Sequence, residues 1–156
     1  MIASVSLLSF QQGDHTMRKT VLMALPLAFL MSTGAALAGP AMDMAKTRIE
    51  AIAKGDVATI TKDYGKDPSL AWIGGPLDGS YASEKAIAEV WAKFSTAQGE
   101  QTATVGELWE AANPKGATVA ANVVFAGKNK VPVLYIMTYR DGKLVDEIWQ
   151  VNPPAK

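Results

Sequence analysis

The stretch VPVLYIMTYRDGKLVDEIWQV, residues 131–151, carries a strong strand and turn pattern. β-branched and aromatic residues fill both of its halves, which is typical of strands. Between the halves stands Asp141-Gly142, a pair that favours a two-residue hairpin turn because both turn positions need a positive φ angle. The segment is therefore predicted to form an antiparallel hairpin, with strands over Val131–Arg140 and Leu144–Val151.

The register of a two-residue turn decides which side chains share a face of this hairpin. It pairs Ile136 with Glu147 and Leu134 with Trp149, and alternation along the strand sends Asp146 and Glu147 to opposite faces. These adjacent carboxylates therefore cannot act as a catalytic pair. One predicted face carries Leu134, Ile136, Thr138, Val145, Glu147 and Trp149, and the other carries Tyr135, Met137, Tyr139, Leu144, Asp146, Ile148 and Gln150. A longer loop with a bulge would change the partners but would not bring the two carboxylates together.

Elements of two kinds precede the hairpin. Period-two patterns predict strands over 102–111 and 117–126, separated by turn residues and therefore paired antiparallel. Period-3.6 patterns predict helices over 42–54, from Asp56 to about Gly65, and after Ser83, where Ile87, Val90, Trp91 and Phe94 form a core-facing stripe. Between the last two helices, DPSLAWIGGPLDGSY reads as a brief strand near 70–73 and a Gly/Pro loop. This order predicts an α+β sandwich, with three N-terminal helices packed on a curved, mixed or antiparallel sheet.

The N-terminal part of the chain reads as an export signal. From Met17, the sequence MRKTVLMALPLAFLMSTGAALA places Arg18 and Lys19 before an apolar run that ends in Ala36-Leu37-Ala38. This pattern predicts cleavage by signal peptidase after Ala38, and the alternative is an uncleaved anchor. Residues 1–16 are interpreted as an upstream extension, 17–38 as the signal peptide and 39–156 as one domain. The mature protein is thus expected in the periplasm or outside the cell, with no membrane attachment after cleavage.

The composition excludes several kinds of chemistry. The chain has no cysteine, and its one histidine, His15, precedes the predicted mature start. A mature chain without Cys or His cannot hold a Ser-His-Asp triad or a His- or Cys-ligated metal, so neither a metal site nor a cofactor is predicted. Residues 39–156 carry thirteen basic and fourteen acidic side chains, a balance that gives no reason to expect nucleic acid.

The order of elements resembles the nuclear transport factor 2-like superfamily, which includes ketosteroid isomerase and polyketide cyclase-like proteins. The likeness is carried by Lys54-Gly55-Asp56, by DPSLAWIGGPLDGS, by the helix of Ile87, Trp91 and Phe94, and by YRDGKLV. It implies a cone with a pocket between sheet and helices, and often a dimer. Matched onto this sequence, the isomerase's base, tyrosine and oxyanion-stabilising acid fall near Trp72, Arg48 and Ile136. All three chemical groups are missing there, which argues against that reaction.

Glu147 has two interpretations. It is either a general base in an apolar pocket or the buried partner of Arg48, and a neighbouring guanidinium lowers a carboxylate pKa and works against the first role. The expected pocket residues are Trp72, Trp91, Ile136, Glu147, Trp149 and Arg48, with residues 72–79 at the rim.

Three functions follow from these residues. The first is a receptacle for a small apolar or aromatic molecule, without the acid–base set of ketosteroid isomerase. The second is a proton-transfer or dehydration enzyme acting on a small carbonyl compound through Glu147. The third is a dimeric accessory subunit. A homodimer is expected through the outer sheet face, which is predicted to carry Tyr135, Met137, Tyr139, Leu144 and Ile148.

Overall fold

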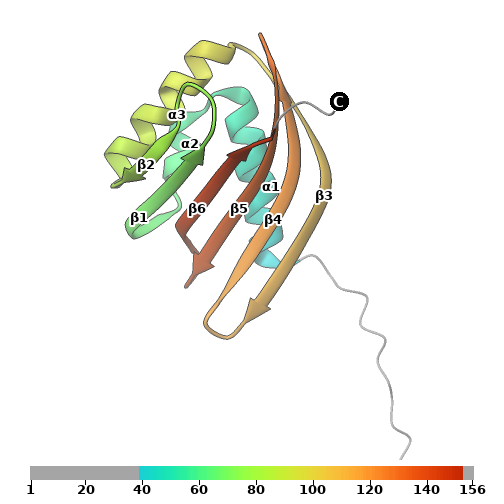
Figure 1. Ribbon diagram of the computed structural model, residues 1–156. Coiled ribbons are helices and arrows are strands. Elements are labelled where there is room, and N and C mark those ends of the chain that lie inside the picture. The colour runs from blue at the N-terminus through green and yellow to red at the C-terminus, as the bar shows by residue number, and fades with distance from the viewer. Residues whose placement is uncertain (1–38, 153–156) are drawn as a thin grey trace, which may run out of the picture. The chain divides into compact units, whose positions relative to one another are not determined.

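The computed structural model describes residues 39–152, which form one six-stranded sheet with three helices against one face (Figure 1). The helices are α1 (Pro40–Lys54), α2 (Val57–Thr61) and α3 (Glu84–Gln98). The strands are β1 (Tyr64–Ile73), β2 (Gly79–Ala82), β3 (Thr102–Asn113), β4 (Gly116–Ala126), β5 (Lys130–Arg140) and β6 (Lys143–Val151). The predicted α+β class and curved, mixed sheet are confirmed. The predicted extension and signal peptide lie outside the described residues.

The strand order puts the end of the chain in the middle of the sheet. The order is β2-β1-β6-β5-β4-β3, with β1 parallel to β6 and every other pair antiparallel. The last strand, β6, is therefore flanked on both sides, and a side chain on its inner face lies under the helices. This placement explains how a carboxylate near the C-terminus, Glu147, becomes a core residue.

Local signals in the sequence begin and end the helices. Asp56 accepts a hydrogen bond from the Thr59 backbone N–H and caps α2, and Ser83 caps α3 in the same way through Ala86. Gly55 ends α1 in the left-handed region, where glycine has no steric penalty. Within residues 39–152, no helix is long and apolar enough to cross a membrane.

The predicted hairpin turn is confirmed, but the register beyond it is wrong by one residue. Asp141 and Gly142 both have positive φ, and Arg140 pairs with Lys143 as expected. A bulge then follows Leu144, so Glu147 faces Met137 rather than Ile136. The extra residue lets both Leu144 and Glu147 point inward although they are three positions apart.

The bulge exchanges the two predicted faces of β5. The inner face carries Val133, Tyr135, Met137 and Tyr139, each at most 4% exposed. Ile136, expected in the pocket, lies on the opposite face of the sheet from Glu147. The outer-face patch predicted from Tyr135, Met137, Tyr139 and Leu144 is also wrong, because those side chains form the core.

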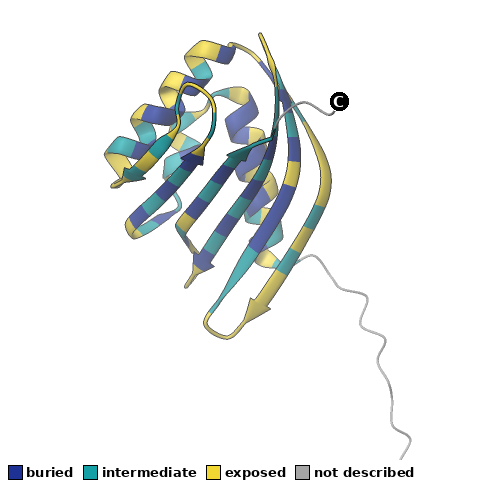
Figure 2. Cartoon of the chain, viewed as in Figure 1, coloured by how far each residue is buried: buried dark blue, intermediate teal, exposed yellow. Residues whose placement is uncertain are grey.

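The space between helices and sheet is filled by aromatic rings. Trp91 packs edge-on against Trp149 with ring centroids 4.9 Å apart, and Trp72 lies 5.0 Å from Trp149. Phe94 and Phe125 extend the same cluster. Figure 2 shows the burial along the central strands and the exposed edge strand β3. The open hollow expected around Glu147 is therefore replaced by a packed core.

Candidate functional site

Arg48 and Glu147 form an ion pair inside the core. Arg48 comes from α1 and Glu147 from β6, and the two residues are 6% and 1% exposed. Arg48 Nη2 donates to Glu147 Oε1 over 2.8 Å and Nε donates to Oε2 over 3.1 Å, a two-point geometry. The contact predicted between these residues is confirmed.

Two tyrosines and a backbone carbonyl complete this polar cluster. Tyr64 and Tyr135 each donate a hydrogen bond to one oxygen of Glu147 and accept one from Arg48. The remaining arm of Arg48, Nη1, donates to the carbonyl of Ile60. The guanidinium also lies 4.8 Å from the centre of the Tyr64 ring. Each charge in the cluster therefore has hydrogen-bond partners, which a buried ion pair requires.

The surroundings hold the tyrosines neutral and the arginine charged. Burial raises the pKa of Tyr135 well above its usual value; Arg48 opposes this rise and Glu147 reinforces it. Burial and Glu147 raise the pKa of Tyr64 in the same way. Burial alone lowers the pKa of Arg48, but Glu147, with the two tyrosines, reverses that effect and raises it well above normal. The tyrosines thus act as hydrogen-bond donors at neutral pH.

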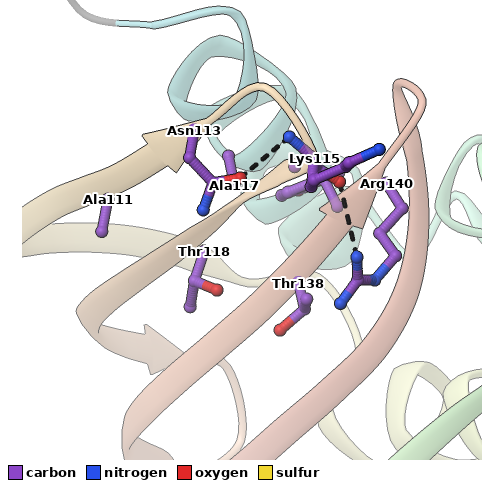
Figure 3. Close-up of a pocket in the computed structure, with 9 residues that line it drawn as sticks. Ala111, Asn113, Lys115, Ala117, Thr118, Thr138 and Arg140 are labelled. Atoms are coloured by element: carbon purple, nitrogen blue, oxygen red, sulfur yellow. Dashed lines mark hydrogen bonds between the residues drawn. The ribbon is translucent and has the colours of Figure 1, made fainter.

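The geometry leaves Glu147 little scope for acid–base chemistry. Both of its oxygens already accept hydrogen bonds from Arg48 and from a tyrosine. A general base must reach the proton it removes, and a substrate would first have to displace those donors. Glu147 lies neither in the wall of the apolar cleft described next nor in that of the hollow in Figure 3.

An apolar cleft opens beside Trp72, at the ends of β1, β6 and α3. Its volume is about 330 Å³. Trp72 and Phe94 form its inner end, where they join the aromatic core. The other lining residues are Gly74, Gly75, Pro76, Leu77, Ala97, Gln98, Asn129, Val131 and Val151. None of the side chains that line it within residues 39–152 carries a charge.

Hydrogen bonds hold both walls of the cleft in place. On one side, the loop between β1 and β2 turns at Gly74, whose N–H donates to Asp78 Oδ1 over 2.6 Å. The Tyr81 hydroxyl donates to the carbonyl of Leu77 over 2.8 Å. On the other side, the end of α3 is tied to the β4–β5 turn because Gln98 Oε1 accepts from the N–H of Asn129. The cleft is thus preformed in the structure.

The structure separates the predicted pocket residues into three groups. Trp72 lines the cleft, and residues 74–77, which belong to the predicted rim at 72–79, form part of its wall. Trp91, Trp149, Arg48 and Glu147 are buried behind it in the core. The indole N–H groups of Trp91 and Trp149 have no hydrogen-bond partner among the described residues. Ile136 lies on the far side of the sheet.

Sequence reasoning missed most of the cleft wall. The helical stripe predicts Phe94 as a core residue, and no pattern in the sequence marks Ala97, Gln98, Asn129, Val131 or Val151 as part of a site. The signal that could have found them is positional. The end of α3, the β4–β5 turn and the end of β6 all lie beside the loop after β1, at one end of the sheet. Residues 79–82, interpreted as loop, form the short edge strand β2.

The uncovered face of the sheet carries one continuous apolar row. Pairing aligns Trp109, Ala120, Ile136, Ile148 and Ala71 on neighbouring strands from β3 to β1. Trp109 is 51% exposed. The next row is polar and includes Thr118, Thr138, Asp146 and Ser69. An apolar centre with a polar border is the usual layout of an interface.

A shallow hollow of about 140 Å³ lies at the hairpin end of this face (Figure 3). Thr118 and Thr138 face each other across β4 and β5, and Arg140 Nη1 donates to the carbonyl of Lys115 over 3.5 Å. The Lys115 N–H donates to Asn113 Oδ1 over 2.8 Å. Hydrogen bonds join Arg140 and Asn113 to Lys115 at its edge, and the hollow does not reach the aromatic core.

Comparison with known proteins gives the fold but no activity. No family model matches the sequence, and no curated protein matches it. Among solved structures, a cystatin-like-fold protein of unknown function from Nostoc punctiforme PCC 73102 has a TM-score of 0.62 and 14% identity, covering 74% of this chain and 90% of its own. A nuclear transport factor 2-like protein of unknown function from Pseudomonas putida KT2440 also has a TM-score of 0.62 and 14% identity, covering 73% and 92%. Another from Mesorhizobium loti has a TM-score of 0.57 and 18% identity, covering 74% and 93%.

These similarities assign the chain to the nuclear transport factor 2-like fold, as its order of elements predicted. Identities this low carry no information about substrate or partner. Any function of the chain therefore depends on its own cleft and surfaces.

Proposed function

We propose that residues 39–156 are an exported binding domain that takes a small, uncharged, largely apolar or aromatic molecule in the cleft beside Trp72. The observation that carries the proposal is the cleft itself, preformed and lined by apolar side chains around two aromatic rings. Its volume of about 330 Å³ is at the lower end of the range for small-molecule sites, roughly 300–1,000 Å³. The ligand is correspondingly small.

The chemistry of the wall narrows the ligand class. Trp72, Leu77 and Phe94 offer aromatic and aliphatic surface, and a ligand ion would lose its hydration without gaining a counter-charge. Gln98 and Asn129 bring side-chain amides to the wall, and these can hold one polar group of the ligand. A planar apolar molecule with a single carbonyl or hydroxyl group fits this arrangement best.

The proposal gives Glu147 a structural role. The carboxylate holds Arg48, Tyr64 and Tyr135 behind the aromatic cluster and so fixes the inner end of the cleft. A ligand in the cleft would contact Trp72 and Phe94, which separate it from the ion pair.

Binding of an uncharged fluorescent probe tests the proposal. N-phenyl-1-naphthylamine brightens on entering apolar sites, and the folded mature protein should enhance its emission with saturable, one-to-one stoichiometry. Native mass spectrometry of the freshly purified protein should show either the mass of a complex with a bound small molecule or, after the probe is added, the mass of a complex with one probe molecule. Emission that rises linearly without saturation, with no complex in the mass spectrum, would contradict a defined site.

We also propose that two copies pair through the uncovered sheet face. The apolar row supports this, since Trp109 is exposed and Ile136 and Ile148 are only half-buried on the face opposite the helices, with the buried Ala120 between them. A face-to-face dimer would cover the row and leave the cleft open, because the cleft lies on the helix side at the end of the sheet.

A further inference from the structure

The predicted cleavage site lies directly before the first residue of the described fold. Cleavage after Ala38 makes Gly39 the first residue of the mature chain, and Gly39 is also the N-cap of α1. Its carbonyl accepts hydrogen bonds from the N–H groups of Met42, over 3.0 Å, and of Asp43, over 3.3 Å. Gly39 is therefore anchored to the helix.

A carboxylate from a distant strand reaches the same point. Glu110 of β3 accepts a hydrogen bond from the Met42 N–H at 2.8 Å, and its side chain is partly buried. A Cβ atom placed on Gly39 would lie only 2.0 Å from Glu110 Oε1. Because N and Cβ on one Cα are about 2.5 Å apart, the Gly39 nitrogen lies within about 4.5 Å of that oxygen.

We propose that cleavage after Ala38 creates an ammonium group on Gly39 that forms an ion pair with Glu110 and becomes part of the fold. Hydrolysis of the Ala38–Gly39 bond consumes one water and leaves a carboxylate on Ala38 and an ammonium on Gly39. In the uncleaved chain the Gly39 nitrogen is a neutral amide. Glu110 can therefore form this ion pair only after the signal peptide has been removed.

The ammonium group of Gly39 needs the Glu110 carboxylate because it lies at the N-terminus of helix α1. A positive charge at a helix N-terminus is unfavourable, because the backbone N–H groups there already carry partial positive charge. The Glu110 carboxylate, together with Asp43 in the first turn, offsets that charge. A Cβ at position 39 would meet the end of the Glu110 side chain, so a larger residue there would have to displace the carboxylate.

The first experiment uses the full chain with its own leader, secreted by a bacterial host. The intact mass of the purified product should equal that of residues 39–156. A product that starts at another residue, or that retains the leader, would overturn the proposal.

The second experiment compares mature chains that begin at Gly39 or at Ala38, a test supported by the single core that residues 39–152 form. The extra residue carries the ammonium about 3.8 Å further along the chain. We expect the chain that begins at Gly39 to have the higher melting temperature by about 2–4 °C, the size of a partly exposed ion pair. No difference, or a difference of the opposite sign, would contradict the ion pair.

Glu110→Gln supplies the specific control. The amide oxygen can still accept from Met42, so the variant keeps the helix cap while losing the charge. The difference between the two chain starts should then disappear or reverse, and an unchanged difference would contradict the role of Glu110. If the variant fails to fold, 1 M salt gives the same test without mutation, since screening should reduce the difference in the wild-type pair.

Discussion

Arg48 and Glu147 are 99 residues apart in the chain and form a two-point ion pair under the centre of the sheet. The pair joins α1, the first element of the described fold, to β6, the last. Two tyrosines and one backbone carbonyl satisfy the remaining polar groups around it. The contact explains how a charged residue from each element can be buried in a largely apolar core.

Removing one charge from this pair should destabilise the protein strongly. Glu147→Gln leaves the Arg48 guanidinium buried without a counter-ion, and breaking a buried pair in this way costs about 3–5 kcal/mol. Urea denaturation followed by circular dichroism measures the loss. The matched control is Glu50→Gln on the exposed face of α1, which should change the free energy of unfolding by less than about 0.5 kcal/mol.

A double variant tests whether the stability lost in Glu147→Gln comes from the unpaired Arg48 charge. Arg48→Met with Glu147→Leu removes both charges and should recover part of the stability lost in Glu147→Gln, because no unpaired charge remains. The recovery is incomplete because the hydroxyl groups of Tyr64 and Tyr135 and the Ile60 carbonyl lose their partners. If Glu147→Gln instead unfolds at the same urea concentration as the wild type, the carboxylate has no structural role. The general-base interpretation would then regain its main support.

Alkaline pH should unfold the protein through its tyrosines. Burial raises the pKa of Tyr64, Tyr135 and Tyr139, three of the four tyrosines in the chain. The folded state therefore keeps protons that the unfolded state releases above the ordinary tyrosine pKa of about 10, so stability is full below that pH and falls as pH rises beyond it. Absorbance at 295 nm should show these three tyrosines ionising together with the loss of circular dichroism. Ionisation of all three in an intact fold would contradict their burial.

Charging the centre of the apolar row should separate the proposed dimer. Light scattering after size exclusion, at tens of micromolar protein, should give twice the chain mass for the wild type. Ile136→Lys would bury an unpaired ammonium in the interface and should give the monomer mass. Ala92→Lys, on the exposed face of α3, is the control and should remain dimeric. A monomeric wild type would exclude this interface at that concentration.

The elements of the fold were predictable from the sequence because local signals agreed with the final structure. The caps at Asp56 and Ser83, the stripe of Ile87, Trp91 and Phe94, and the Asp141-Gly142 turn all depend on residues close in sequence. The ion pair was also predictable, since few partners exist for a carboxylate on a buried strand. The general fold class follows from these elements in order.

The register of β6 was not predictable from alternation. Both faces of β5 are rich in apolar residues, with Tyr135 and Met137 on one side and Leu134 and Ile136 on the other, so either face could have been the core. The bulge after Leu144 determines which face of β5 lies with Glu147 in the core, and no residue in that stretch predicts a bulge. The cleft was missed for a related reason, because its wall is assembled from four segments that only the tertiary fold brings together.

Probe binding by two tryptophan variants of α3 tests whether the cleft is the binding site. Ala97 is exposed on the cleft side and Ala92 is exposed outside it, so Ala97→Trp should fill the cleft while Ala92→Trp should not. We expect Ala97→Trp to weaken N-phenyl-1-naphthylamine binding by about tenfold or more, equal to about 1.4 kcal/mol, and Ala92→Trp to bind like the wild type. Equal binding by all three proteins would show that the molecule is held elsewhere and would contradict the cleft as the binding site.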